Sequence, residues 1–315
     1  VDLAPRAFAG LVNAVLRKLA AEGPALLEGL DAARLDTPPW LWTAWHGAYG
    51  PAVRAIAEAH NGPAPLDLSF KPGALPPEGA EALPGGSFRL PAGTRVTEIP
   101  GFAEGQFWVQ DAAAALPARL LAPRAGENIA DLCAAPGGKT AQLAAAGAKV
   151  TAVERDAKRA ARLRENLARL QLPTEIVTAD AASWKPAAPF DAILLDAPCT
   201  ATGTIRRHPD VAWLKRARDV ATATALQSRL LQAAAGMLAP GGRLVFATCS
   251  LQAEEGEAHL REAPALGLKL DPISPAEVPG LEEAILPSGA LRTRPDYWGA
   301  RGGMDGFFIA RFVKG

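Results

Sequence analysis

The chain of 315 residues lacks several features that mark specialised classes of protein. Its three cysteines are too few, and odd in number, for a disulfide framework, which fits a reducing compartment and leaves thiols free for chemistry. No apolar run reaches the roughly eighteen residues of a membrane span, and the amino end has no basic stretch leading into an apolar one. We therefore expect a cytoplasmic protein that does not associate with membranes.

An excess of charge is also lacking, since 33 basic residues balance 33 acidic ones. Nucleic-acid-binding proteins usually carry extra Lys and Arg, so any such role must rest on a local patch. The four histidines have no metal-ligand spacing, and no metal site is predicted. What is present, 49% hydrophobic and 21% charged residues, is typical of a globular protein with one large domain and a smaller companion.

The first hundred residues have an irregular organisation. Apolar residues recur at helical spacing in residues 6–20, which predicts a helix there. A second helix-like stretch spans residues 36–58, and residues 61–104 are rich in Pro and Gly around short runs such as LDLSF, which predicts a small module. Three tryptophans of the second stretch could stack on nucleobases, although aromatic residues at this spacing more often form core. They are Trp40, Trp42 and Trp45.

After residue 105, short apolar runs alternate with helical segments. This alternation predicts an α/β fold with a parallel sheet covered on both faces. The predicted strands lie in NIADLCAAPGG, KVTAVE, TEIVTAD, FDAILLDAPC and GRLVFATCS. Ligands of such sheets bind beyond the carboxyl ends of the strands, near the point where the strand order reverses. Polar residues gather at these predicted ends, namely Asp131, Cys133, Glu154, Asp180, Asp196, Cys199 and Cys249.

The turn CAAPGGKT, residues 133–140, matches neither of two phosphate-binding patterns. A P-loop would need Gly where Cys133 stands, and the dinucleotide pattern fails because Gly137 and Gly138 are adjacent. What remains is a tight turn between a strand and a helix, followed by an acid, Glu154, placed to accept hydrogen bonds from ribose hydroxyls. Asp180, at the end of the following strand, would then contact the adenine side of the ligand. One such acid would more simply cap a helix or turn, but acids on successive strand ends favour a nucleoside ligand.

Several motifs resemble, in order, those of the Sun/Fmu family of S-adenosylmethionine-dependent RNA (cytosine-5) methyltransferases. They are DLCAAPGGKT, LLDAPCTATGTIRRHPD, ATCSLQAEEGE and DGFFIARF. The resemblance covers residues 105–315 and implies a Rossmann-like class I methyltransferase domain there. The stretch IRRHPDVAWL resembles the bacterial type that modifies small-subunit ribosomal RNA. Residues 61–104 would be an RNA-binding subdomain, and residues 1–60 a remnant of a NusB-like domain with connecting helices.

The resemblance also implies roles for individual residues. Cys249 would be the nucleophile that adds to cytosine, Asp196 would contact the base, and Cys199 would assist release of the product. Residue chemistry alone leaves the choice between the thiols open, because DNA cytosine methyltransferases use a Pro-Cys pair that resembles Pro198 and Cys199. S-adenosylmethionine would be bound by Cys133, Ala134, Ala135, Pro136, Gly137, Gly138, Lys139, Glu154, Asp180 and Asp196.

Basic residues cluster directly after the predicted active-site strand. From Ile205 to Arg218 the chain carries several basic residues and one acid before Asp219, so we expect Arg206 and Arg207 to hold RNA phosphates while the target base is turned out. A solvated helix face is the simpler alternative. We expect a monomer that acts on 16S ribosomal RNA. A transfer-RNA substrate stays open, as does an RNA-binding assembly factor whose methyl-donor site is vestigial.

Overall fold

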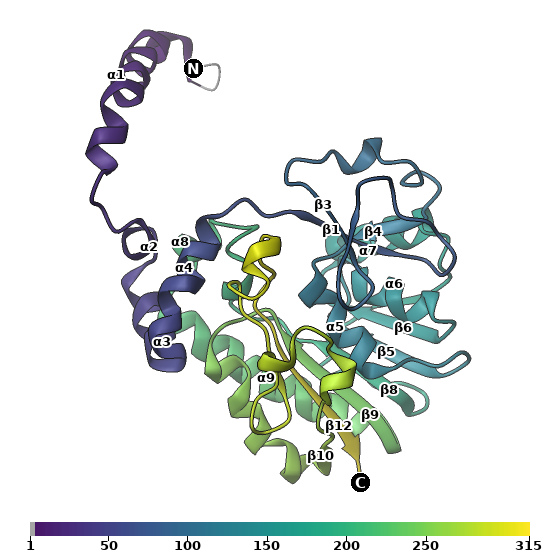
Figure 1. Ribbon diagram of the computed structural model, residues 1–315. Helices are drawn as coiled ribbons and strands as arrows, with labels where there is room; N and C mark the ends of the chain where they lie inside the picture. The colour runs from purple at the N-terminus through teal and green to yellow at the C-terminus, as the bar shows by residue number, and fades with distance from the viewer. Residues whose placement is uncertain (1–3) are drawn as a thin grey trace.

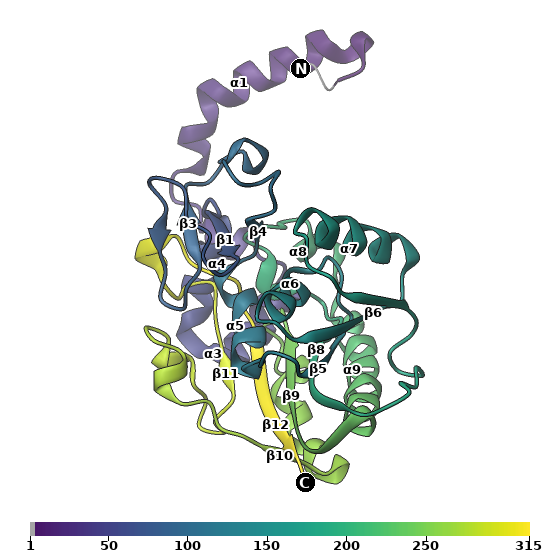
Figure 2. The ribbon, with the colours of Figure 1, turned by 90° about the vertical axis from the view of Figure 1, so that its right-hand side faces the viewer.

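The computed structural model describes residues 4–315 and begins with four helices (Figure 1). These are α1 (Ala9–Leu27), α2 (Ala32–Leu35), α3 (Pro39–Tyr49) and α4 (Val53–Asn61). Helix α1 stands apart from the rest of the molecule in two perpendicular views, and none of its residues is buried (Figures 1 and 2). The helix predicted over residues 6–20 is therefore confirmed, but its apolar stripe, which includes Leu11 and Leu19, faces solvent in this structure.

Helices α3 and α4 pack against loops of the large domain. Their buried residues Leu41, Trp45 and Ile56 form one cluster with Ile205 and Leu251. Trp40 and Trp42 lie partly buried at the edge of this cluster, so the interpretation of the tryptophans as core residues is confirmed. Helices α3 and α4 thereby contact the segments of the chain that follow Cys199 and Cys249.

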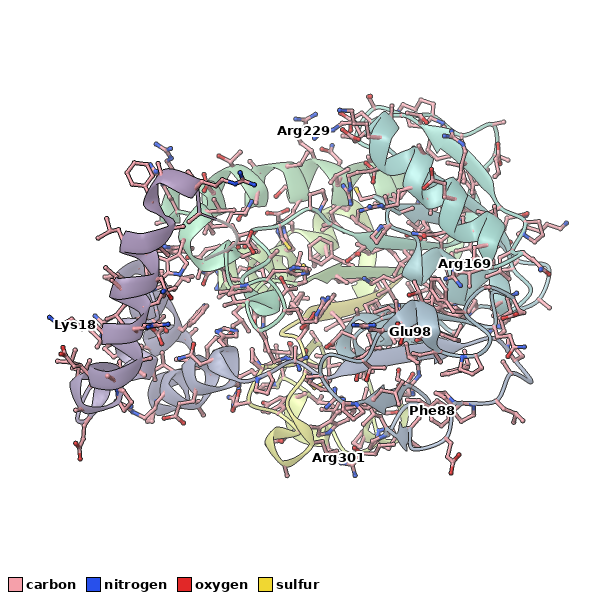
Figure 3. The ribbon with its side chains drawn as sticks, turned by 90° about the horizontal axis from the view of Figure 1, so that it is seen from above. Lys18, Phe88, Glu98, Arg169, Arg229 and Arg301 are labelled. Atoms are coloured by element: carbon pink, nitrogen blue, oxygen red, sulfur yellow. The ribbon has the colours of Figure 1, made fainter. Side chains whose placement is uncertain are left out.

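A small antiparallel sheet follows, with the strand order β2-β3-β1-β4. The strands are β1 (Leu66–Phe70), β2 (Glu81–Ala82), β3 (Phe88–Leu90) and β4 (Phe107–Val109), so the sheet extends past residue 104. Arg169 of the large domain lies beside the connection between β3 and β4, which carries the labelled Glu98 (Figure 3). The Arg169 guanidinium donates to the Phe102 carbonyl at 2.7 Å and lies 4.2 Å from the centre of the Phe102 ring. These contacts fix the small sheet to the large domain.

The large sheet has the order β10-β12-β9-β8-β5-β6-β7, with β11 paired to β12. Its strands are β5 (Asn128–Leu132), β6 (Lys149–Glu154), β7 (Glu175–Thr178), β8 (Phe190–Asp196), β9 (Leu238–Thr248), β10 (Leu268–Leu270), β11 (Leu291–Arg292) and β12 (Phe308–Lys314). Strands β5 to β9 are parallel, and β12 runs antiparallel to β9. Every predicted strand is confirmed. The chain moves outward from β5 to β7 and returns on the other side of β5, so the order reverses between β5 and β8.

Helices cover both faces of this sheet (Figure 2). They are α5 (Ala112–Leu121), α6 (Gly138–Ala145), α7 (Ala157–Arg169) and α9 (Ala217–Met237), whereas the short α8 (Val211–Leu214) packs through Ala212 in the cluster of α3 and α4. Leu194 of β8 packs in a cluster with Leu116 and Leu120 of α5, whereas the next residue, Leu195, packs with Leu230 of α9. Alternate residues of one strand thus bury opposite faces, which explains the continuous apolar runs and confirms the predicted α/β fold. No helix in residues 4–315 combines the length and apolar character of a membrane span.

Candidate functional site

The turn after β5 brings backbone close to the switch point of the sheet. Gly137 adopts φ +108°, and a Cβ atom there would come within 2.6 Å of Leu163, so a side chain is excluded both by conformation and by space. Cys133 also has a positive φ of 64°. Its backbone N–H donates to the Val153 carbonyl at 2.9 Å, which ties the turn to β6. Glycine at position 137 therefore lets the turn pack closely against Leu163 of α7, next to the amino end of α6.

Asp131, at the end of β5, has one carboxylate oxygen without a protein partner. Its Oδ2 accepts a hydrogen bond from the Thr140 hydroxyl at 2.5 Å, whereas the buried Oδ1 has no partner among residues 4–315. Burial raises the pKa of Asp131 to about 7. Because buried polar atoms are normally hydrogen-bonded, the orphaned oxygen fits a donor group supplied by a ligand at this turn.

Glu154 and Asp180 lie at the rim of one small cavity. Its walls are largely apolar and come from the carboxyl ends of β5, β6, β7 and β8 and from helix α9; they include Cys133, Val153, Ala179, Ala181, Pro198, Leu226 and Leu230. Glu154 Oε1 accepts from the Asp156 N–H at 2.9 Å, and Asp180 Oδ1 accepts from the Ala182 N–H at 3.0 Å. Both acids therefore stabilise turns and also border a slot between apolar walls, where a flat ring would be shielded from water.

Lys139 lies in an ion pair with Asp196. Its Nζ is 2.7 Å from Asp196 Oδ2 and 5.1 Å from the centre of the Phe307 ring. Burial opposes the ammonium form, but the charges of Asp196 and, further away, of Cys249 and Asp131 leave the pKa of Lys139 raised. Sequence reasoning placed Lys139 beside a cofactor and missed this partner, because 57 residues separate the pair along the chain.

Cys199 and Cys249 follow β8 and β9, and their sulfur atoms lie 3.4 Å apart. Both side chains are partly accessible. The hydrogen bond with Cys249, followed by burial, raises the pKa of the Cys199 thiol well above its ordinary value. The structure thus brings together the two thiols and, through Lys139, the carboxylate of Asp196.

Cys133 differs from this pair. It packs partly against the core on the α9 face, and burial raises its pKa to about 12. Its side chain therefore packs as a small hydrophobic residue does. A thiol held so firmly in its protonated form is a poor nucleophile.

Arg206 lies in the interior, which corrects its expected place on an RNA-facing surface. Only 1% of its side chain is exposed, and its guanidinium is 2.8 Å from Asp111 and 3.6 Å from Asp305. Arg207, with 33% of its side chain exposed, also pairs with Asp305, at 2.5 Å. The two aspartates lie far from the arginines in sequence and offset their charge, a compensation that a local run of basic residues cannot reveal.

The exposed cations of this region lie further along the chain. Arg216 and Arg218 are exposed at the start of α9, and Lys215 is half-buried. Next to them on α8, Trp213 and Leu214 are 64% and 70% exposed. Cations beside an exposed aromatic ring are typical of surfaces that contact single-stranded nucleic acid.

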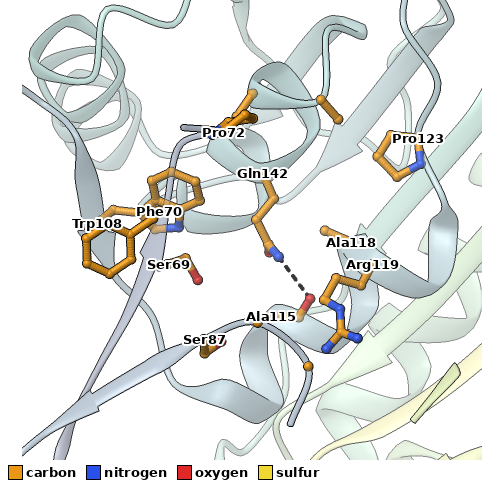
Figure 4. A pocket seen from close by; sticks show the side chains of 14 residues that line it. Ser69, Phe70, Pro72, Ser87, Trp108, Ala115, Ala118, Arg119, Pro123 and Gln142 are labelled. Atoms are coloured by element: carbon orange, nitrogen blue, oxygen red, sulfur yellow. Dashed lines mark hydrogen bonds between the residues drawn. The ribbon is translucent and has the colours of Figure 1, made fainter. Parts of the chain in front are cut away.

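A second cavity lies between the small sheet and helices α5 and α6 (Figure 4). Phe70, Trp108 and Arg119 line it, together with Gln142, whose side-chain amide donates to the Ala115 carbonyl at 3.0 Å. No thiol or carboxylate lines this cavity. This cavity therefore offers no nucleophilic thiol and no carboxylate, unlike the carboxyl edge of the large sheet.

The chain is similar to known proteins over most of its length. The family described as 16S rRNA methyltransferase RsmB/F matches residues 118–313. The chain is 38% identical to a ribosomal RNA small subunit methyltransferase B of Cronobacter sakazakii, over 98% of this chain and 73% of that protein. It is 40% identical to the protein of the same name from Vibrio cholerae, over 90% of this chain and 72% of that protein.

Solved structures share the fold. A methyltransferase homologue from Pyrococcus horikoshii superimposes with a TM-score of 0.75 at 28% identity, over 90% of this chain and 98% of that one. NSun6 from the same organism, solved with SFG, gives a TM-score of 0.73 at 20% identity, over 88% of this chain and 98% of that one. The predicted methyltransferase fold is confirmed.

Proposed function

Because the chain belongs to the RsmB/F family of 16S rRNA methyltransferases, we propose that it methylates carbon 5 of a cytosine in 16S ribosomal RNA, with S-adenosylmethionine as methyl donor. One observation carries the proposal: two thiols lie 3.4 Å apart beyond the carboxyl ends of the neighbouring strands β8 and β9. The Lys139–Asp196 ion pair belongs to the same edge of the sheet, since Asp196 pairs with Ala247, two residues before Cys249.

The residues present fit S-adenosylmethionine, which supplies an electrophilic methyl group when bound. The orphaned Asp131 Oδ1 suits the ammonium of its methionine part, next to the turn from Cys133 to Gly138. Glu154 would accept from the ribose hydroxyls, and the small apolar cavity that Asp180 borders would hold the adenine. Glu154 Oε2 also lies 3.4 Å from the Arg159 guanidinium and 3.4 Å from the Ala135 nitrogen, and the carboxylate keeps further lone pairs for a ligand.

A nucleophilic cysteine is required because carbon 5 of cytosine is a weak nucleophile. In the proposed reaction the Cys249 thiolate forms a bond to carbon 6. The electrons of the carbon 5–carbon 6 double bond then shift through carbon 4 toward ring nitrogen 3. Carbon 5 then becomes enamine-like and takes up the methyl group. Covalent catalysis of this kind divides one difficult step into easier ones.

Asp196 would carry a proton from the Lys139 ammonium to ring nitrogen 3, because an ionised carboxylate alone could not stabilise the electrons that this atom gains during the addition. Afterwards the proton on carbon 5 would pass to the Cys199 sulfur as the Cys199 thiol gives its own proton to Cys249, so that the electrons of the carbon 5–hydrogen bond reform the double bond and expel Cys249 from carbon 6. The Cys199 sulfur is placed to assist this release, because it lies next to that of Cys249. Its raised pKa favours the protonated thiol, so its role in release includes holding or relaying a proton beside the leaving sulfur.

The proposal is tested by mapping 5-methylcytosine in ribosomal and transfer RNA from cells that lack the protein. The expected result is loss of one or more methylated cytosines in 16S ribosomal RNA. The wild-type gene should restore them, whereas the Cys249→Ala variant at equal abundance should not. Loss confined to transfer RNA would contradict the assigned substrate, and restoration by Cys249→Ala would favour an assembly role without thiol chemistry.

A further inference from the structure

Glu255 is a fully buried acid between the two cysteine loops. It ends a 3-10 turn (Ala253–Glu255) that follows β9, and its exposed area is zero. No Lys, Arg or His of residues 4–315 forms an ion pair with it. Burying a carboxylate without a cation is costly unless several donors satisfy its oxygens.

Those donors come mainly from the residues that directly follow the two cysteines. Glu255 Oε1 accepts from the Thr200 backbone N–H at 2.8 Å, and Oε2 accepts from the Thr200 hydroxyl. Oε2 also accepts from the Ser250 hydroxyl at 2.5 Å. Thr200 follows Cys199 and Ser250 follows Cys249, so a single carboxylate joins the two thiol-bearing loops.

Further contacts make this junction rigid. Gln227 of α9 donates to Glu255 Oε1 at 3.2 Å, and the Glu255 carbonyl accepts from the Thr248 hydroxyl at 2.8 Å. The Gly203 N–H donates to the Cys249 carbonyl at 3.0 Å, which links the loops a second time. A glutamine at this position would place its NH2 group where Oε2 lies, and the Thr200 and Ser250 hydroxyls would have to turn from donating to accepting.

We propose that Glu255 is a positioning residue, which sets the separation of Cys199 and Cys249 and maintains a negative charge beside the Cys199 thiol. The inference rests on the proposed function, in which both thiols act on one cytosine. Charge-assisted hydrogen bonds are short and directional, so a carboxylate holds two loops in register more strictly than apolar packing would.

The electrostatic part of the proposal agrees with the surroundings of Cys199. After the hydrogen bond to Cys249, burial and the charge of Cys249, the charge of Glu255 further raises the pKa of the Cys199 thiol. Loss of the Glu255 charge should therefore lower that pKa. A residue that served only packing would leave it unchanged.

The first test uses Glu255→Gln with Glu254→Gln as the matched control, since Glu254 is the exposed neighbour. In single-turnover reactions with S-adenosylmethionine and 16S ribosomal RNA, Glu255→Gln should retain both substrate affinities within about twofold. Its turnover should fall at least tenfold, and the covalent protein–RNA species should persist longer than in the control. Turnover and adduct lifetime equal to those of Glu254→Gln would overturn the positioning role.

The second test does not depend on RNA methylation. With Cys133→Ala and Cys249→Ala present, Cys199 is the only cysteine, and its alkylation by iodoacetamide can be followed against pH. Adding Glu255→Gln should lower the midpoint pH, whereas adding Glu254→Gln should not. A shifted midpoint in a protein that methylates no RNA would reject the proposed function alone, and an unshifted midpoint would reject the role of Glu255.

If Glu255→Gln does not fold, Ser250→Ala tests the same junction by removing a single donor. It should prolong the adduct in the same direction but less strongly. Normal adduct lifetime in Ser250→Ala, together with unfolding of Glu255→Gln, would assign Glu255 to stability and overturn the proposal.

Discussion

The sulfur atoms of Cys199 and Cys249 lie 3.4 Å apart although fifty residues separate them in the chain. The register of two parallel strands explains this proximity. Asp196 at the end of β8 pairs with Ala247 of β9, so the chain leaves both strands at the same level of the sheet. The thiols follow within three residues of these partners, and the sheet itself therefore assembles the proposed catalytic pair.

Removing the cation that holds Asp196 should impair catalysis more than cofactor binding. In Lys139→Met, Asp196 loses the ammonium that lies 2.7 Å from its carboxylate, and 30% of the Asp196 side chain is exposed. The loss of this charged hydrogen bond should lower the free energy of unfolding by about 1.5–3 kcal/mol. Methyl transfer at saturating substrate should fall about 10²-fold, because Asp196 loses its fixed orientation. Calorimetric denaturation and steady-state kinetics measure the two effects.

The exposed Lys149, at the start of β6, provides the control for this variant. Lys149→Met should change neither turnover nor stability appreciably. Full turnover in Lys139→Met would show that Asp196 needs no cation.

The Glu154→Ala variant should weaken binding of S-adenosylhomocysteine. Ribose hydroxyls buried without their acceptor cost about 1–3 kcal/mol, or about 5- to 150-fold in affinity. Glu154→Asp should have a milder effect. Isothermal titration calorimetry gives both affinities, and unchanged binding by a folded Glu154→Ala protein would mean that the acid serves only the turn at Asp156.

The alternation of apolar and polar residues predicted the strands and the acids at their ends, which are Asp131, Glu154, Asp180 and Asp196. This was possible because a buried parallel strand is apolar along its length, whereas the residues at its carboxyl end are often polar and contact ligands. Contacts between distant segments could not be predicted in this way. The partner of Lys139 belongs to another strand, and the donors to Glu255 come from two loops.

The environment of Arg206 could not be predicted from the sequence either. Within a basic run it resembles an exposed residue, and only the fold brings Asp111 and Asp305 to its guanidinium. Helix α1 shows the converse, since its apolar stripe predicted the helix correctly but did not indicate what would cover that face. Periodicity reports that a face is apolar, whereas burial depends on neighbours that may lie anywhere in the chain.

Loss of Arg206 should therefore destabilise the protein rather than weaken RNA binding alone. Arg206→Met leaves Asp111 buried without its cation, and breaking such a pair costs about 3–5 kcal/mol. Arg218→Met, at an exposed position, should change stability by less than about 0.5 kcal/mol. It should instead reduce the dependence of RNA affinity on salt concentration, as loss of a phosphate contact does.

Denaturation by urea and RNA binding at several salt concentrations distinguish these two outcomes. Equal stability of Arg206→Met and the wild type would contradict a structural role for the buried pair. An unchanged salt dependence in Arg218→Met would remove this residue from the RNA-binding surface.

Asp131 should make the stability of the cofactor-free protein depend on pH. Its pKa is raised to about 7 by burial, so the folded state binds its proton more tightly than the unfolded state, where the pKa is near 3.8. Its contribution is most favourable below pH 3.8 and is lost as the pH rises toward 7. The stability of Asp131→Asn, which cannot titrate, should therefore increase relative to the wild type over this range. If the unfolding free energies of the wild type and of Asp131→Asn changed with pH in parallel, the raised pKa of Asp131 would be contradicted.

The most direct measurement of the central claim is denaturing electrophoresis of each cysteine variant after incubation with 16S ribosomal RNA and S-adenosylmethionine. If Cys249 forms the bond to carbon 6 and Cys199 assists release, Cys199→Ala should accumulate a protein–RNA species that survives denaturation. Cys249→Ala should form none, and its methyl transfer should fall by orders of magnitude. An adduct in Cys249→Ala and none in Cys199→Ala would reverse the two roles, and full activity of both variants would contradict thiol catalysis altogether.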